Sequence, residues 1–228
     1  MDFDSIFQAY YSVFRADSDV PASSDDEYTV GLRLANEAIN RWAYFDDTYW
    51  KELWTTAQTN STGGVVTITT GTKQYACPTA FQEAGGMVRI LDANGDTVET
   101  YRIIDNEKKQ FMGDESQYAY ITGNPSAGYT LNLNPAPPSA LNGLSIEYDY
   151  YKKPTYLTTG TDVPEMQDPY FIVHRMVANQ LRAARNPYYT SARTDAENAL
   201  KQMQIDNNSG NWANPFSMPD TAGSTWGQ

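Results

Sequence analysis

Apolar residues recur at helical spacing near both ends of the chain, whereas its middle has short runs typical of strands. The first expected helix has an apolar face made of Phe3, Ile6, Phe7, Tyr10, Tyr11 and Phe14. A second helix is expected over residues 27–44, with Tyr28, Leu32, Ala35, Ile39 and Trp42 on one side. Residues 24–27 before it match a capping box, in which two side chains satisfy unpaired backbone amides. A further turn or two, capped by Asp46 or Asp47, is expected to end near Ala57.

Residues 162–203 predict two more helices with a corner between them. Asp168 can cap the first of these, and Pro169 can occupy its first turn. Its apolar side consists of Ile172, Val173, Met176, Val177, Leu181 and Ala184, and its opposite side of His174, Arg175, Arg182 and Arg185. The pair Asn186-Pro187 ends the helix, because the residue before a proline is driven out of the α region.

The last expected helix also has two distinct sides. Its apolar stripe consists of Tyr189, Ala192, Ala196, Ala199, Leu200 and Met203. On the outside, Arg193, Glu197 and Lys201 lie four residues apart, a spacing that favours a weak ladder of ion pairs. Residues 207–228 are rich in Asn, Gly, Ser and Pro and predict an extended tail, although they contain large apolar side chains.

The middle of the chain predicts about six short strands. These are expected at residues 65–69, 87–91, 97–104, 118–122, 129–133 and 144–151. Asn94-Gly95, within residues 92–96, is a strong hairpin signal, because both residues accept a positive φ. Strands of this length and spacing are typical of a small antiparallel sandwich or barrel.

These patterns predict an α+β fold. A helical bundle domain is built from both chain ends, residues 1–58 and 157–206, because neither half can bury its apolar stripe alone. An antiparallel β-sandwich or barrel-like insertion, residues 59–156, interrupts it, and residues 207–228 form an extended C-terminal tail.

Composition narrows the possible functions. The net charge of −12 argues against a protein that grips nucleic acid through its phosphates. Eleven acidic and four basic residues fall within residues 1–57, so the N-terminal part is the acidic end. The single cysteine, Cys77, excludes an internal disulfide and suits a reducing cytoplasm. No signal peptide and no apolar run of membrane-spanning length is evident.

No group of residues assembles a convincing active, cofactor or metal site. His174 is the only histidine and is expected to be structural, and Cys77 is expected to be an inert buried thiol. Glu147 and Asp149 share one face of a strand, which the opposing apolar positions explain as a solvent face. Residues 92–96 lack most ligands of a calcium loop, so the hairpin interpretation is favoured. The chain is therefore not expected to be an enzyme.

Two segments resemble the head-to-tail connector, or adaptor, proteins of tailed bacteriophages, which form a ring below the portal. The first contains Val163-Pro164-Glu165-Met166-Gln167-Asp168-Pro169-Tyr170, the basic helix after it, and the corner Arg185-Asn186-Pro187-Tyr188-Tyr189. The second is the acidic segment that opens the helix over residues 27–44 and leads to Thr48-Tyr49-Trp50-Lys51-Glu52-Leu53-Trp54. Together they cover about two-fifths of the chain.

The resemblance implies a structural protein of the virion neck, made in the host bacterial cytoplasm. Members of this family form a ring, typically of twelve copies, that binds the portal, continues the DNA channel and leads to the tail or the next neck protein. Genomic DNA would pass without specific binding. Arg175, Arg182, Arg185 and Arg193 are candidates for contacts between neighbouring copies, since arginine is enriched at interfaces.

In the same family, C-terminal extensions commonly reach onto the portal. The large side chains expected to anchor the tail there are Trp212, Phe216, Met218 and Trp226. An alternative function is a glycan- or surface-binding β module, because many of the 17 tyrosines lie in the β region and could stack on sugars. An adaptor should assemble or bind a portal, whereas such a module should bind glycan.

Overall fold

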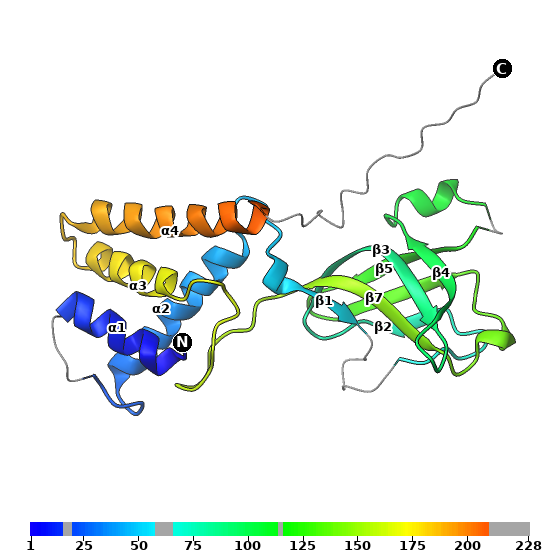
Figure 1. Cartoon of the computed structure of the whole chain (residues 1–228), viewed down its shortest axis with the longest axis horizontal. Helices are drawn as coiled ribbons and strands as arrows, with labels where there is room; N and C mark the ends of the chain where they lie inside the picture. The colour runs from blue at the N-terminus through cyan, green and yellow to red at the C-terminus, as the bar shows by residue number, and fades with distance from the viewer. Residues whose placement is uncertain (16–19, 58–65, 114–115, 210–228) are drawn as a thin grey trace, which may run out of the picture. The chain divides into compact units, whose positions relative to one another are not determined.

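The chain folds into two compact units, which are described separately (Figure 1). The structure is a computed structural model that describes residues 1–15, 20–57, 66–113 and 116–209. The first unit contains Met1–Leu53 and the chain that returns from Pro154, and the second contains Trp54–Lys153. The chain therefore leaves the helical unit once and returns to it once.

The helical unit is formed by α1 (Phe3–Arg15), α2 (Asp26–Ala43), the 3-10 turn η1 (Lys51–Leu53), α3 (Tyr170–Ala183) and α4 (Tyr189–Ser209). The four helices confirm those predicted from the apolar stripes. Helices α1 and α2 both pack on α3, and α3 packs on α4. The two ends of the chain thus share one core.

Aromatic side chains fill much of this core. Phe3 and Phe7 on α1 meet Tyr28 on α2 edge-on, with ring centroids 5.1 and 5.3 Å apart. Trp42 and Trp50 are both buried with centroids 5.5 Å apart, and Trp50 Nε1 donates a hydrogen bond to the Trp42 carbonyl. Burying a side chain of this kind stabilises the fold by roughly 1.5–3 kcal/mol, so these contacts contribute substantially to the stability of the helical unit.

The start of α2 differs from the predicted capping box. Asp25 is the N-cap, but no side-chain cap hydrogen bond forms. Its Oδ2 instead accepts from the Ala22 N–H, and Glu27 bonds to Tyr11 and Arg15 of α1. The acidic segment therefore ties α2 to the preceding helix rather than to its own amides. Leu32 is only half-buried, whereas Leu34 and Ala38 are buried.

The β unit is one seven-stranded sheet with the order β1-β7-β3-β4-β5-β6-β2, curled as Figure 1 shows. The strands are β1 (Trp54–Ala57), β2 (Gln74–Ala76), β3 (Phe81–Leu91), β4 (Thr97–Ile103), β5 (Tyr118–Asn124), β6 (Gly128–Asn134) and β7 (Ser145–Lys152). Two 3-10 turns, η2 (Lys108–Phe111) and η3 (Ser139–Leu141), lie between them. The α+β fold class predicted from the sequence is confirmed, and the β region takes the barrel-like form rather than two stacked sheets. One pair, β4 with β5, is parallel, whereas all other pairs are antiparallel.

Two local predictions were wrong. Residues 54–57 form strand β1 rather than the end of a helix, because they pair with Tyr148–Tyr151 of β7. Only Thr67 of the expected strand at residues 65–69 makes a bridge, to Ser145, and Val65 lies outside the described residues. The predicted hairpin is confirmed between β3 and β4, where Gly95 has a φ of +86° and Asp92 Oδ1 accepts from the Asn94 and Asp96 amides.

The β unit contains an apolar core of its own. Its largest fully buried side chains include Phe81, Tyr101 and Ile68, and Phe81 stacks on Tyr150 with centroids 5.6 Å apart. The remaining buried members are Ala57, Tyr75, Cys77, Val88, Ile90, Ala119, Leu131, Leu133, Leu141, Ile146 and Tyr148. The apolar side chains of the β unit therefore pack mainly against one another.

Candidate functional site: charged surfaces of the helical unit

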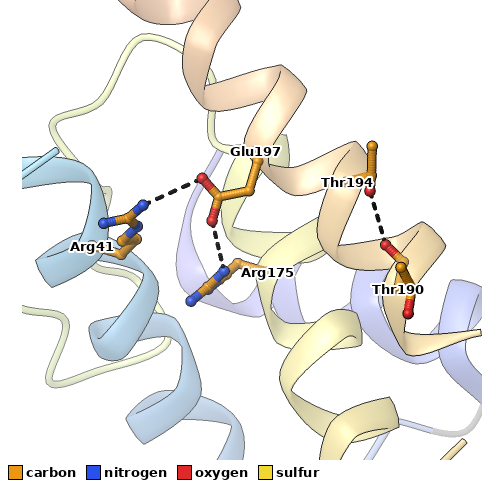
Figure 2. Close-up of polar contacts among 5 residues, drawn as sticks. All are labelled: Arg41, Arg175, Thr190, Thr194 and Glu197. Carbon is orange, nitrogen blue, oxygen red and sulfur yellow. Dashed lines mark hydrogen bonds and ion pairs between the residues drawn. The ribbon is translucent and has the colours of Figure 1, made fainter. Parts of the chain in front are cut away.

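Glu197 of α4 links three helices through its two carboxylate oxygens (Figure 2). Arg41 of α2 donates to Oε2 at 3.3 Å, and Arg175 of α3 donates to Oε1 at 3.2 Å. The side chains of Glu197 and Arg175 are only 21% and 23% exposed. An ion pair that is partly withdrawn from water is screened less than a surface pair, so this cluster holds α4 against α2 and α3.

The cluster changes the interpretation of two predicted features. Arg175, a candidate for contacts between copies, binds a carboxylate of its own chain. The predicted ladder of Arg193, Glu197 and Lys201 does not form, because the Glu197 side chain turns inward to Arg41 and Arg175. Helix spacing alone identified the three residues, but it could not reveal an arginine 156 residues away in sequence.

The corner between α3 and α4 is built by local hydrogen bonds. The N–H groups of Ala184 and Arg185 donate to carbonyls in the last turn of α3, and Arg185 has a φ of +52°. Asn186 Oδ1 then accepts from the Tyr188 N–H, which starts the next helix one residue later. In the first turns of α4, Thr194 Oγ1 donates to the Thr190 carbonyl (Figure 2). The helix thus ends at Asn186-Pro187 in a hydrogen-bonded corner, as predicted.

Three of the four predicted arginines present their charge around this corner. Arg182, Arg185 and Arg193 are exposed, and none of them has an ion pair with another residue of the described chain. Tyr188 beside them is 73% exposed. The corner is therefore a basic surface with an exposed aromatic ring, and we call Arg182, Arg185, Tyr188 and Arg193 the corner surface.

Acidic groups gather where α1 meets the start of α2. Arg15 donates to Glu27 Oε1 at 2.9 Å, and the Tyr11 hydroxyl donates to the other oxygen. The Tyr11 hydrogen bond, aided by Arg15, holds the pKa of Glu27 below its ordinary value. Asp25 and Asp26 next to it are exposed. Glu27 is thus held by α1, and Asp25 and Asp26 add exposed carboxylates beside it.

The last turn of α4 is fixed to the end of the N-terminal segment. Asn207 is a buried polar residue whose Oδ1 accepts from the Lys51 N–H at 3.1 Å and whose Nδ2 donates to the Tyr49 carbonyl at 2.9 Å. Gln204 adds a bond to the Thr48 hydroxyl. Helix α4 thus continues to Ser209, and the prediction that the extended tail begins at residue 207 was wrong, because Asn207 is fixed in the helical unit. Trp212, Phe216, Met218 and Trp226 themselves lie outside the described residues.

The two residues considered as reactive groups have different surroundings. His174 is exposed on α3. Cys77 is buried, and this burial raises the pKa of its thiol to about 11. A thiol with so high a pKa is almost entirely protonated at neutral pH, and the protonated thiol is a poor nucleophile.

The carboxylates of the β unit are used in structure. Arg89 of β3 binds Glu147 at 2.7 Å and Asp149 at 3.6 Å, and the Thr56 hydroxyl donates to Asp149. Ile146, Tyr148 and Tyr150 alternate with them and are buried, as predicted. Among the described residues, no group of three or more His, Cys, Asp or Glu could hold a metal ion. Within the same residues, no helix combines the length and apolar character that a membrane span requires.

The tyrosines of the β unit are poorly placed for stacking on sugars. Tyr75, Tyr101, Tyr118, Tyr148, Tyr150 and Tyr151 are all buried. Burial raises the pKa of Tyr148 strongly, which is consistent with a core position. Tyr120 and Tyr129 are half-buried, so few rings of this unit remain for the stacking on which the glycan-binding alternative rests.

Sequence reasoning missed three polar residues that position the helical unit: Arg41, Asn36 and Asn207. Each pairs with a residue more than 100 positions away in sequence. Asn207 carried one available signal, since it is a polar residue four positions after Met203 on the apolar stripe. A polar residue at such a position has to find hydrogen-bond partners when it is buried.

Comparison with known proteins decides the family. The model of the family described as SU10 adaptor protein matches residues 10–219, which is most of the chain. The chain belongs to the SU10 adaptor protein family. No curated protein matches it. The suspected relation to phage head-tail adaptors is confirmed, and the match extends well beyond the two segments that first suggested it.

Membership of the SU10 adaptor family gives the chain a coarse function. It is a phage structural protein with an adaptor role in the neck, which places it in the virion. An adaptor interacts with other head or tail proteins of the phage. The family is structural and is not a class of enzymes.

Proposed function

We propose that this adaptor assembles as a ring of twelve copies under the portal and continues the DNA channel toward the tail. The observation that carries the proposal is the family match over residues 10–219. The resemblance of residues 163–170 and of the α3–α4 corner to connector proteins supports the ring. The helical unit forms the body of the ring, and the β unit contacts the tail or the next neck protein.

The charge of the chain suits a channel that DNA slides through. Each copy has a net charge of −12, and a ring multiplies that charge around one axis. An acidic wall repels phosphates at close range, while salt confines the field to about 10 Å. Genomic DNA therefore passes without specific binding, because an acidic channel wall does not bind the phosphates of its backbone.

The corner surface provides a contact between neighbouring copies. Arg182, Arg185 and Arg193 are exposed cations, and the acidic surface around Asp26 and Glu27 supplies carboxylates on the same chain type. Opposite charges on two surfaces of one subunit favour head-to-tail association, which closes into a ring. Arg175 contributes indirectly, because its bond to Glu197 fixes the helix that presents Arg182.

The C-terminal tail supplies the contact with the portal. Trp212, Phe216, Met218 and Trp226 provide large apolar side chains in a segment of little charge. Each such side chain contributes roughly 1.5–3 kcal/mol when it is buried. This offsets the conformational entropy lost when a flexible segment becomes ordered only if backbone hydrogen bonds form as well. Repetition around the ring then raises a modest affinity per copy through effective concentration.

The experiment is co-sedimentation of the purified portal with four forms of the adaptor. The full chain should sediment with the portal, whereas a chain ending at Ser209 should remain folded and unbound. Replacing Arg182 and Arg185 together by Glu should weaken binding, because the corner then repels the acidic surface. Replacing Arg33, which is exposed on α2 and pairs with Glu37, by Glu is the matched control. Normal binding of both altered forms would contradict the proposed contacts.

A further inference from the structure

A small pocket opens between α1, α2 and α3 of the helical unit, and we call it the α1–α2 pocket. Its volume is about 190 Å³. Its mainly apolar walls consist of Tyr10, Tyr11, Val30, Gly31 and Leu34. Gln180 of α3 also lines it. A cavity of about 150 Å³ can hold benzene, so the space is sufficient for one aromatic ring.

The rim of the α1–α2 pocket is acidic. Glu27 lies on it and is bonded to Tyr11 and Arg15 of α1. Asp26 lies beside Glu27 on the same rim and is exposed. Arg15 balances the charge of Glu27, so Asp26 and the neighbouring Asp25 leave the rim with an excess of negative charge. The pocket thus combines an apolar interior with a negative entrance, which favours an aromatic side chain accompanied by cations.

Tyr188 is an aromatic side chain of this kind. It is 73% exposed, although both of its backbone polar groups are hydrogen-bonded. Its N–H donates to Asn186 Oδ1 at 2.9 Å, and its carbonyl accepts from the Ala192 N–H at 3.1 Å. The corner therefore fixes the position from which the side chain extends into solvent. Tyrosine contributes a large contact area at a small cost in conformational entropy and is common among the residues that dominate protein interfaces.

The charge around Tyr188 distinguishes it from other exposed apolar side chains. Residues 169–194 contain four arginines and no acidic residue. Outside α1 and α2, the other apolar side chains of the helical unit that are more than half exposed each have an aspartate within two positions in sequence: Val163, Tyr170 and Ile205. Of these four side chains, only Tyr188 has nearby arginines and no nearby carboxylate in sequence. It is therefore the one that matches an acidic entrance.

The α1–α2 pocket and the corner surface lie on different sides of α3. Helix α3 packs on α1 and α2 and also on α4, and it lies between them (Figure 1). Gln180 lines the pocket, and Arg182, two residues later, points about 200° away around the helix. A contact between the corner of one copy and the pocket of another thus joins two unlike surfaces. Head-to-tail contacts of this kind can close into a ring.

We propose that Tyr188 of one copy inserts its side chain into the α1–α2 pocket of the neighbouring copy. The arginines of the corner surface then face Asp25 and Asp26 at the entrance. Gln180 offers its side-chain amide to the Tyr188 hydroxyl, since a buried tyrosine hydroxyl usually has a hydrogen-bond partner. This inference rests on the proposed ring, and it names the side chain and the pocket through which neighbouring copies recognise each other.

Photo-crosslinking tests the contact. The photoreactive residue p-azidophenylalanine, an aromatic side chain similar in size to tyrosine, replaces Tyr188 in the full chain. The protein is irradiated at high concentration with and without the purified portal. The expected product joins two copies, with the second attachment point at residues 26–34 or 10–15 by mass spectrometry. The same probe at Tyr170, which is also exposed, should give little of this product. Attachment to the portal in place of a second copy would overturn the proposal.

Filling the pocket is the second test. Val30→Trp adds a large side chain at a pocket wall that is already 40% exposed, so the fold should tolerate it. Thr29→Trp adds the same group at the neighbouring exposed position, which does not line the pocket. Val30→Trp should lower the yield of the crosslink at least about tenfold, as expected when an aromatic anchor is excluded from an interface, whereas Thr29→Trp should not. A yield that Val30→Trp leaves unchanged would contradict the proposal.

The contact and the proposed function fail separately in this experiment. A complete ring on the portal without a crosslink from position 188 to the pocket would overturn the contact and leave the ring intact. The crosslink without a ring on the portal would support the contact and contradict the proposed arrangement in the neck. Absence of both the crosslink and the ring would overturn both.

Discussion

The side-chain amide of Asn36 makes both of its hydrogen bonds with the backbone of Leu157. The Leu157 N–H donates to Asn36 Oδ1 at 2.8 Å, and Asn36 Nδ2 donates to the Leu157 carbonyl at 2.9 Å. The side-chain amide of a helical residue thus makes the same pair of hydrogen bonds with an extended segment as a neighbouring β-strand would. It fastens the returning chain to α2 and also buries the Leu157 side chain in the helical core.

Asn36→Ala should therefore destabilise the helical unit. Both backbone groups of Leu157 lose their partner, and leaving partly buried polar groups unpaired costs about 1–3 kcal/mol. The measurement is the urea midpoint of unfolding followed by circular dichroism. The control is Asn40→Ala, which removes a bond to the more exposed Tyr156 hydroxyl and should cost clearly less. Equal effects of the two variants would contradict the assigned role of Asn36.

Glu197→Gln should weaken the attachment of α4. The substitution keeps the volume of the side chain but leaves Arg41 and Arg175 close together without a counter-charge. A loss of about 1–2 kcal/mol in the free energy of unfolding is expected, because the pair is partly buried but Arg41 can still be solvated. Glu37→Gln, which breaks the exposed pair with Arg33, should cost less than about 0.5 kcal/mol. The reverse ranking would disprove the role of the cluster.

Gly31→Ala in the middle of α2 should lower stability although alanine favours helix. An added Cβ would clash with the ring of Phe7, and Phe7 is fully buried. Overpacking typically costs about 1–3 kcal/mol, which exceeds a helix-propensity gain of about 1 kcal/mol. Thr29→Ala, an exposed site on the same helix, should raise the thermal midpoint slightly. A higher midpoint for Gly31→Ala would show that α1 and α2 are not packed as described.

Acid should remove one specific contribution to stability. Amide and hydroxyl groups of Thr158 and Thr159 donate to Asp162 and hold its pKa well below the ordinary value of 3.8. A carboxyl with a lowered folded-state pKa stabilises the fold above about pH 4, and this contribution is lost as the pH falls further. Asp162→Asn should therefore lower the urea midpoint at pH 7 and differ less from the original chain at pH 3. A difference that does not change with pH would contradict this account.

The sequence was sufficient where short-range pattern decides the structure. The stripes at Phe3–Phe14 and at Ile172–Met176 predicted α1 and α3, and Asn186-Pro187 predicted the corner. Asn94-Gly95 predicted the hairpin between β3 and β4. In each of these cases the signal and the structure lie within one or two turns of the chain, so local chemistry determines the outcome.

The sequence was insufficient where a contact with a residue far away in the chain determines the structure. Trp54–Ala57 becomes a strand because β7 lies beside it, almost 100 residues later. Glu197 turns inward because Arg41 is there to meet it. Strand β4 pairs with β5 over only two residues before the chain leaves the sheet after Ile104, and no local pattern in the sequence indicates this.

Counting subunits on the portal tests the central claim most directly. The purified adaptor should be mixed with its portal, and the complex should be imaged by electron cryomicroscopy and averaged without imposed symmetry. Our account predicts one ring of twelve adaptors under the portal, with an open axial channel and contacts between the corner surface of one copy and the acidic surface of the next. Adaptors that bind the portal singly, or that form no ring with an axial channel, would contradict it.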